Sequence, residues 1–183
     1  MLEPVTEMGE KSEMKGLLKE ILIAVVIAFV IMQFIKPTIV KESSMQPTLY
    51  ENNYILLNKQ AYHFGKPEQG DIIVFHTGLK LENGKEKMLI KRVIGLPGDT
   101  IRIAEGKVYI NGKELKEDYT KDGYTDGYIE DLKIPEGQLF VMGDNRLVSI
   151  DSRVEEVGTV KIDQVLGKAF VRLYPFNEIC LIK

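Results

Sequence analysis

The sequence predicts a mostly β protein, with an antiparallel β-sheet domain that follows one N-terminal transmembrane helix. Three observations support this fold class. One apolar run of membrane length lies near the N-terminus, short segments with period-two alternation fill the rest of the chain, and Gly, Pro and Asn separate those segments. With 183 residues, 44% of them hydrophobic, the chain has room for one globular domain with its own core, plus an appendage.

The apolar run covers residues 17–35 and is followed by Lys36 and Pro37. Its length is close to the roughly 20 residues with which a helix crosses the hydrocarbon core, and Pro37 predicts the end of the helix. We therefore expect a tail over residues 1–16, a transmembrane anchor over 17–36 and a β domain over 37–183. Lys11, Lys15 and Lys19 precede the continuous apolar stretch 21–35, and Lys36 and Lys41 follow it, a small excess that slightly favours a cytoplasmic tail and an extracytoplasmic β domain.

Two other interpretations of the apolar run have less support. A cleavable secretory signal would be followed by a small-residue cleavage site, but Lys36-Pro37-Thr38 follows this run. A core helix of a globular domain would show a polar face, and the run shows none. An uncleaved anchor is the better interpretation.

Within the β domain, Asn111-Gly112 predicts a two-residue hairpin turn, and residues 96–99 (LPGD) predict a tight turn with Pro and Gly at its centre. Residues 117–131 are acidic, rich in tyrosine and without clear periodicity, so we expect a surface excursion there and assign it no chemistry. The segments that we expect to form strands, rich in Val, Ile, Leu, Phe and Tyr, are 54–57, 71–76, 88–95, 100–104, 107–110, 138–142 and 168–174.

Charge and cysteine content exclude some classes of function. The net charge of -3 and the absence of a Lys/Arg cluster argue against nucleic acid as a partner. Cys180 is the single cysteine, so the chain cannot form an intramolecular disulfide. The acidic residues and histidines lack metal-ligand spacing, and we expect neither a metal nor a cofactor.

The first functional candidate is a serine between the anchor and the first expected strand, in residues 43–49 (SSMQPTL). Isolated serines are usually turn or cap residues. Pro47, however, restricts the backbone around Ser44 and Met45, which can hold the Ser44 hydroxyl exposed with its own amide beside it. Such a serine acts as a nucleophile only if a base lies next to it.

The second candidate is Lys91, an amine within the apolar segment 88–95 (MLIKRVIG). A strand lysine ordinarily faces solvent, and a pKa near ~10.4 leaves about one amine in a thousand neutral at neutral pH. Burial beside apolar side chains such as Met45 lowers a lysine pKa and yields a neutral base. A Ser44/Lys91 pair needs no histidine, and we interpret His63 and His76 as structural or surface residues.

The third candidate is the polar run 143–153 (GDNRLVSIDSR), directly after an expected apolar strand. Ser149 or Ser152 could orient the lysine amine through a hydrogen bond. The alternative is a loop held by its own salt bridges, which would use Asp144, Arg146, Asp151 and Arg153.

Four motifs, in this order, resemble those of the bacterial type I signal peptidases: SMQPTL at 44–49 after a membrane span, GDIIVF at 70–75, KRVIGLPGD at 91–99 and GDNRLVSIDSR at 143–153. The size and the single anchor are similar to the short Gram-positive members. The resemblance implies an antiparallel β-sheet catalytic domain of the signal-peptidase/LexA type, outside the cytoplasm over residues 37–183. It also implies a serine endopeptidase of the plasma membrane that removes signal peptides from exported preproteins after small residues, often Ala-x-Ala.

The same resemblance implies roles for particular residues. Ser44 matches the nucleophile, Lys91 the general base and Ser149 the hydroxyl that positions the lysine. Further supporting residues are Arg92, Asp144, Asp151 and Arg153, of which the last two match residues that brace the site. Small apolar pockets that select alanine are expected near Val40, Met45, Leu49 and Ile90.

Two positions depart from the family's pattern. Glu42 stands where some members carry a serine or glycine, and because a carboxylate cannot donate a hydrogen bond, the second oxyanion donor is not identified. Leu147-Val148 replaces the polar pair that usually precedes the serine of the last motif.

Two alternative functions have less support. A self-cleaving regulator of the LexA type uses a similar Ser and Lys pair, but the anchor and the lack of a DNA-binding segment argue against it. A membrane-tethered binding protein would not need both Ser44 and Lys91. The expected partners are signal peptides and membrane lipid, and the sequence leaves the oligomeric state open.

Overall fold

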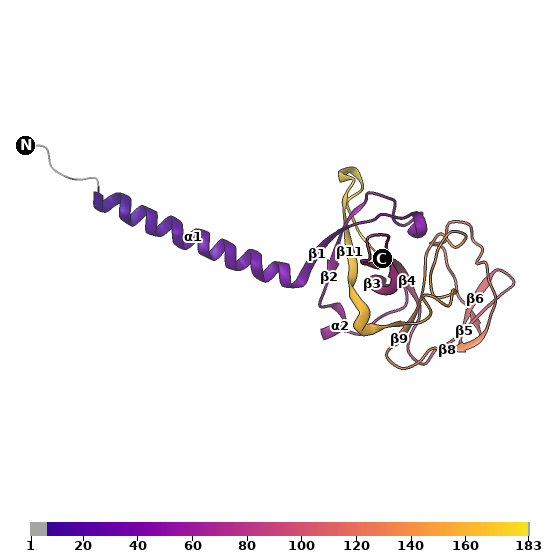
Figure 1. Ribbon diagram of the computed structural model, residues 1–183. Helices are drawn as coiled ribbons and strands as arrows, with labels where there is room; N and C mark the ends of the chain where they lie inside the picture. The colour runs from indigo at the N-terminus through magenta and orange to yellow at the C-terminus, as the bar shows by residue number, and fades with distance from the viewer. Residues whose placement is uncertain (1–6, 183) are drawn as a thin grey trace, which may run out of the picture. The chain divides into compact units, whose positions relative to one another are not determined.

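The computed structural model describes residues 7–182, in two compact units that meet between Ile35 and Lys36 (Figure 1). The first unit is helix α1 (Glu7–Phe34). The second contains two β-sheets with antiparallel pairing. The predicted fold class is therefore confirmed, while residues 1–6 of the predicted tail lie outside the described residues.

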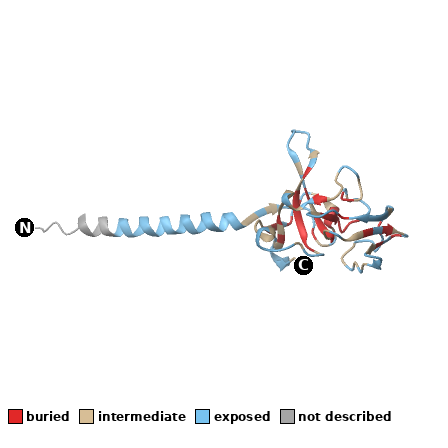
Figure 2. Cartoon of the chain, turned by 90° about the horizontal axis from the view of Figure 1, so that it is seen from below, coloured by how far each residue is buried: buried red, intermediate tan, exposed pale blue. Residues whose placement is uncertain are grey.

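Helix α1 is longer than the predicted anchor and begins at Glu7. Residues 7–16 include Glu, Lys and Met, which are strong helix formers, so the helix extends beyond its apolar part. Over Glu13–Phe34 none of the side chains is buried, and Figure 2 shows this part in the colour of exposed residues. An apolar helix of this length with exposed side chains fits a membrane span.

The larger sheet has the strand order β1-β2-β11-β3-β4-β9-β10, with β12 paired to β11. In the view of Figure 1 the smaller sheet, of order β7-β6-β5-β8, lies beyond β4 and β9. The strands of the larger sheet are β1 (Ile35–Ile39), β2 (Tyr54–Asn58), β3 (Ile72–Lys80), β4 (Glu86–Gly95), β9 (Gln138–Met142), β10 (Val160–Lys161), β11 (Val165–Tyr174) and β12 (Cys180–Leu181). Those of the smaller sheet are β5 (Thr100–Ala104), β6 (Lys107–Ile110), β7 (Lys113–Glu114) and β8 (Ile129–Lys133).

Short helices connect some of the strands: η1 (Ser43–Met45), α2 (Ala61–Phe64), η2 (Ile162–Gln164) and η3 (Phe176–Glu178). The predicted turns form. Asn111 and Gly112 have positive φ angles between the paired strands β6 and β7, and Gly98, at φ 86°, completes the turn that joins β4 to β5.

The core has three clusters, and the larger sheet is buried on both faces. Along β3, Ile72 and Val74 pack in one cluster while Ile73 and Phe75 pack in another. A strand covered on both sides has a continuous apolar sequence, which explains the run that forms β3. The third cluster joins the sheets, since Phe140 of β9 packs with residues of β5.

Most of residues 117–131 are exposed, as expected of a surface excursion, but part of the segment is tied to the rest of the domain. Thr125 is buried, Glu117 pairs with Arg146, and residues 129–131 begin β8, which pairs with β5. Strand β8 has the sequence IEDLK, in which exposed charged residues separate the two apolar residues. Pattern alone therefore gave no strand signal there.

Candidate active site

Ser44 lies in η1, on the segment that connects β1 to β2, and only 4% of its surface is exposed. The residues around it hold this segment in place. Met45 and Leu49 are fully buried in the cluster beneath β2 and β3, and the Leu49 amide donates to the Met45 carbonyl at 2.8 Å. The serine is thus carried by a short helix that is anchored by its apolar neighbours.

Lys91 projects from β4 and is fully buried. Its Nζ lies 2.6 Å from Ser44 Oγ, within hydrogen-bond distance. Burial lowers the pKa of Lys91 from 10.5 to about 8; Asp151 and Glu42 raise this pKa by their charge, while Lys87 and Arg153 lower it. The structure therefore brings together the two residues predicted to form a dyad, and the lowered pKa makes the neutral form of the amine far more accessible near physiological pH than in an exposed lysine.

The polar run after β9 packs directly against η1. The backbone amide of Asn145 donates to the Ser44 carbonyl at 3.0 Å, and Asn145 Nδ2 donates to the Ser43 carbonyl at 3.2 Å. A Cβ atom on Gly143 would collide with the Ser44 carbonyl oxygen and Ser149 Oγ, so glycine is needed for this close approach. Sequence analysis did not single out Asn145, whose contacts depend on long-range packing.

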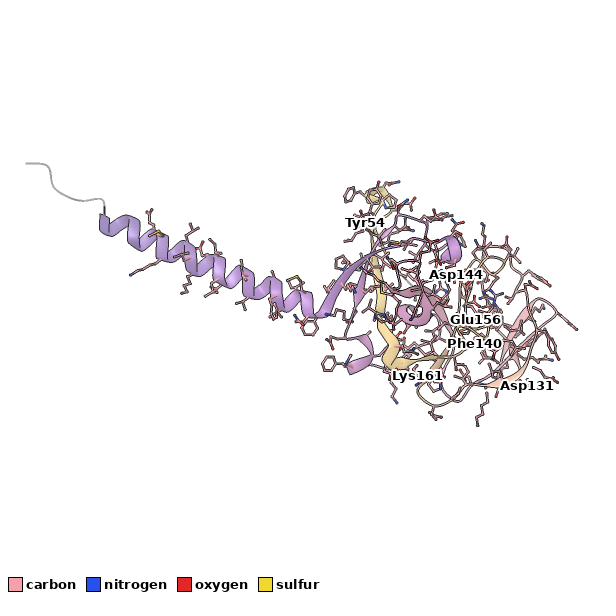
Figure 3. All side chains as sticks on the ribbon, viewed as in Figure 1. Tyr54, Asp131, Phe140, Asp144, Glu156 and Lys161 are labelled. Carbon is pink, nitrogen blue, oxygen red and sulfur yellow. The ribbon has the colours of Figure 1, made fainter. Side chains whose placement is uncertain are left out.

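Arg92 and Asp144 form a buried bidentate ion pair beside the dyad. Arg92 Nε lies 2.9 Å from Asp144 Oδ1, and Arg92 Nη2 lies 2.8 Å from Asp144 Oδ2. Thr48, another residue without a predicted role, donates its hydroxyl hydrogen to Asp144 Oδ2. In the view of Figure 3, Asp144 lies between Tyr54 of the larger sheet and Asp131 of the smaller one. The pair ties β4 to the loop after β9 and to the segment that carries Ser44.

Asp151 and Arg153 form a second ion pair within the same loop. Asp151 Oδ2 accepts from the Gly143 amide at 3.0 Å, and Asp151 Oδ1 accepts from Arg153 Nε at 2.8 Å. Arg153 Nη2 also donates to the Arg146 carbonyl at 2.7 Å. Both predicted bracing residues thus hold the backbone of the loop that contacts η1.

Ser149 is close to the site but does not bond Lys91. Its Oγ is buried and has no hydrogen-bond partner among the described residues, while it lies near Gly143 and the Ser44 carbonyl. Ser152, the alternative orienting serine, instead accepts from the Val141 amide at 2.9 Å. Of the two serines, Ser149 is therefore the one with a free hydroxyl next to η1.

The segment before β8 also supports the site. Arg146 Nη1 donates to Glu117 Oε2 at 2.9 Å and to the Thr125 hydroxyl. The Tyr119 ring lies against the Arg92 guanidinium, 4.1 Å from ring centroid to Cζ. Residues of a segment that had no assigned chemistry thus contact two arginines next to the dyad.

A groove of about 180 Å³ lies between residues 38–42 and residues 86–90, with Val74 and Leu81 also on its walls. Val40 and Ile90, two of the predicted pocket residues, line it. The other two, Met45 and Leu49, belong to the buried core cluster. Each wall of the groove continues directly into a dyad residue, Ser44 on one side and Lys91 on the other.

Glu42 is engaged at this groove, where its Oε1 lies 2.7 Å from Lys87 Nζ. The remaining titratable residues that the sequence raised lie elsewhere. His76 pairs with Glu86 at 3.3 Å, His63 lies in α2, and Cys180 is exposed. Within residues 7–182, no cluster of His, Cys, Asp and Glu has an arrangement that could hold a metal ion.

Comparison with known proteins gives consistent results. The family model described as signal peptidase, peptidase S26, matches residues 14–174. Signal peptidase I of Bacillus licheniformis is 36% identical over 93% of this chain and 94% of that protein. Signal peptidase I S of Bacillus subtilis is 38% identical over 87% of this chain and 89% of that protein. Signal peptidase I of Leptolyngbya laminosa is 39% identical over 91% and 82%, respectively.

A solved structure is also similar, the signal peptidase I of Enterococcus faecalis. It is 35% identical, with a TM-score of 0.46, over 56% of this chain and 96% of that one.

Proposed function

Because the chain belongs to the peptidase S26 family of signal peptidases, we propose that it is a membrane-bound enzyme that cleaves signal peptides from exported preproteins with Ser44 as nucleophile and Lys91 as general base. The observation that carries the assignment of these residues is the 2.6 Å distance between Lys91 Nζ and Ser44 Oγ. Burial of the amine supports it, since a lysine base must be neutral.

In this mechanism the neutral amine of Lys91 accepts the Ser44 hydroxyl proton while Oγ attacks the scissile carbonyl carbon. The resulting tetrahedral intermediate collapses when the bond from carbon to nitrogen breaks, and protonated Lys91 gives its proton to the leaving amine. Lys91 then takes a proton from water, the hydroxide attacks the acyl-enzyme, and the peptide acid leaves as Ser44 Oγ is protonated again. Every proton that is moved passes through the one buried amine.

The negative charge that develops on the carbonyl oxygen of the tetrahedral intermediate must be stabilised by hydrogen-bond donors. The backbone amide of Ser44 would supply one, a contribution typically worth about 3–4 kcal/mol in such reactions. Glu42 cannot supply a second, because it is a carboxylate and already accepts from Lys87. Ser149, whose buried hydroxyl has no hydrogen-bond partner among the described residues, would be the group that positions the Lys91 amine.

The groove supports recognition of an extended peptide. Strand β9 pairs with β4 from Arg92 onward, so among the described pairs residues 86–90 of β4 have a strand, β3, on one side. A peptide would add as a strand on the other side, with its backbone bonded to β4. Val40 and Ile90 would limit the room for side chains next to Ser44, which favours alanine at the cleavage point.

The exposed apolar helix α1 supports a single-pass anchor in the plasma membrane. Signal peptides reach the enzyme within or next to the bilayer, so an anchored enzyme meets them in two dimensions. We propose that the N-terminus is cytoplasmic and that residues 37–183 are extracytoplasmic, as the lysine distribution indicates.

The decisive experiment measures processing of a purified preprotein with an Ala-x-Ala signal peptide by the detergent-solubilised protein. We expect cleavage after the second alanine by the wild type, and none by Ser44→Ala or Lys91→Ala. Thermal unfolding of each variant controls for folding. Cleavage at the wild-type rate by either folded variant would show that the proposed dyad is wrong.

A further inference from the structure

One ion pair joins the two walls of the peptide groove. Glu42 Oε1 and Lys87 Nζ are 2.7 Å apart, and both residues line the groove. Glu42 belongs to the wall that leads to Ser44, and Lys87 belongs to the β4 wall that leads to Lys91. The pair therefore spans the groove, with Glu42 two residues from Ser44 and Lys87 four residues from Lys91 along the chain.

The walls that this pair connects are not neighbours in the sheet. In the strand order, β2, β11 and β3 separate β1 from β4, so the segment after β1 reaches β4 only because the sheet curves. The space between the walls is where a peptide strand would pair with residues 86–90. A peptide strand in this space would meet the side chains of Glu42 and Lys87, so the ion pair would have to separate when the peptide binds.

We infer that the Glu42–Lys87 ion pair is a gate across the peptide groove, which closes the groove beside Ser44 in the free enzyme and parts when a substrate binds. This inference rests on the proposed function, because it assigns the two residues a role in binding the same substrate. It makes Glu42 and Lys87 positioning residues that control access to the dyad.

The exposure of the pair suits a gate. The Glu42 and Lys87 side chains are 45% and 24% exposed, so water replaces the lost contacts when they separate, and such pairs contribute little to stability. The neighbouring Arg92–Asp144 pair is 3% and 0% exposed and would leave uncompensated buried charges if it opened. Of these two pairs beside the dyad, only Glu42–Lys87 can open at low cost.

The charges of the gate also reach the dyad. Four charged groups act on Lys91: Asp151 and Glu42 raise its pKa, whereas Lys87 and Arg153 lower it. Glu42 and Lys87 therefore oppose each other, and removing one of them leaves the other unbalanced. This gives the inference a readout that a pair remote from the site would not change.

Binding is measured first, without turnover. In full-length protein carrying Ser44→Ala, we measure the Kd of a signal peptide with and without the double substitution E42Q/K87M. Removal of the gate should lower Kd about two- to fivefold, the amount that corresponds to a partly exposed ion pair. An unchanged Kd shows that the pair is not in the peptide's path, and a raised Kd shows that it holds the peptide instead; either result overturns the inference.

The pair Lys107–Glu114 provides a matched control. Its side chains are 52% and 51% exposed and 2.9 Å apart, and it lies on the smaller sheet between β6 and β7. K107M/E114Q removes the same two charges and should leave Kd unchanged. A similar drop in Kd for this control would show that the effect of E42Q/K87M comes from the loss of two surface charges and not from opening of the groove.

The pH profile of kcat/KM is measured next, in protein that retains Ser44. E42Q should shift the acidic limb to lower pH, K87M should shift it to higher pH, and the double variant should return it close to the wild-type position. Identical profiles for all three variants would overturn the placement of the pair beside Lys91. Failure of the proposed function is a separate result, because the wild type itself would then not process the preprotein.

Discussion

Burial of Lys91 makes its amine available as a base and also destabilises the folded protein. A charged amine is poorly accommodated at a fully buried position, and burial lowers its pKa to about 8. The neutral amine that results is useful as a base, but below pH 8 the folded protein must hold a buried ammonium that the unfolded chain exposes to water. The reactivity and the cost in stability come from the same desolvation.

The first prediction concerns the rate of cleavage between pH 6 and pH 9. With the pKa of Lys91 near 8, about one-tenth of the enzyme has a neutral base at pH 7. We expect kcat/KM to rise about tenfold per pH unit on the acidic side and to level off above pH 8. A rate that does not change across this range is incompatible with Lys91 as the titrating base.

The second prediction concerns the stability of Lys91→Met, which replaces the amine with an apolar side chain of similar length. The folded pKa is about 8 and the ordinary value is 10.5, so the penalty is complete below pH 8 and disappears as pH rises to 10.5. Relief of about 3 kcal/mol, less about 1 for the lost hydrogen bond of Ser44, should stabilise the variant by roughly 2 kcal/mol at pH 7.

Chemical denaturation at pH 7 and at pH 10 tests this gain, which should shrink at the higher pH. A variant that is less stable than the wild type at pH 7 would contradict the assignment of a desolvation penalty to Lys91. In either case the variant should be inactive, since it has no base.

At the scale of elements, the site depends on how the loop after β9 docks on η1. Backbone groups make the closest contacts, at the carbonyls of Ser43 and Ser44, so the geometry depends on loop conformation more than on any one side chain. The ion pairs Asp151–Arg153 and Arg146–Glu117 stabilise that loop conformation. The loop thereby holds the segment that carries Ser44 in place.

The third prediction concerns Gly143→Ala. The added Cβ collides with the backbone carbonyl of Ser44, which cannot rotate away as a flexible side chain would. Moving η1 by a fraction of an ångström should lengthen the contact between serine and lysine, and we expect kcat to fall at least about tenfold with little change in KM. Gly78→Ala, where a Cβ meets nothing within 4 Å, is the matched control. Equal kcat values for the two variants would refute a positioning role for Gly143.

The fourth prediction concerns the brace between the loop and residues 117–125. Arg146→Met leaves Glu117 largely buried without its partner, and we expect a loss of about 3 kcal/mol in the free energy of unfolding. Lys107→Met, which breaks a solvent-exposed pair, should cost much less. Denaturant titration measures both losses. Similar losses for the two variants would show that the buried Arg146–Glu117 pair contributes no more to stability than an exposed pair.

The strands that sequence analysis predicted share two properties, apolar alternation or a continuous apolar run, and a turn signal at each end. Strand β3 and the hairpin at Asn111-Gly112 are examples, since local chemistry alone specifies them. The strands that it missed are β1, which begins within the predicted anchor, the very short β10 and β12, and the charged β8. Their formation depends on a partner strand that is distant in sequence.

The site shows the same division. Ser44 and Lys91 were predicted because their motifs carry both residues in a specific local sequence, and the structure brings them within 2.6 Å. The roles of Asn145 and Thr48 could not be predicted, because each depends on a contact between segments far apart in the chain. The ion pair of Glu42 belongs to this second class, since nothing in the local sequence indicates Lys87 as its partner.

At the scale of the whole molecule, the chain joins an apolar helix to a β domain whose reactive amine is kept from water. The two units are compact in themselves and have different tasks. The apolar part of the helix has no polar face and fits the bilayer, while strand β3 at the centre of the larger sheet packs in a core cluster on each of its faces. The side of the membrane on which the β domain lies determines whether the dyad can reach the cleavage sites of exported preproteins.

The fifth prediction tests that orientation with the single cysteine. Cys180 is exposed on β12, at the edge of the larger sheet, so its thiol is a natural label site. In right-side-out membrane vesicles, a membrane-impermeant maleimide should label Cys180 without detergent, because Lys11, Lys15 and Lys19, which precede the apolar part of α1, favour retention of the N-terminus in the cytoplasm. Cys180→Ser is the control for specific labelling, and S12C in that background should be labelled only after permeabilisation. The reverse pattern, with Ser12→Cys reactive and Cys180 protected, would place the dyad on the cytoplasmic side, where translocated signal peptides could not reach it.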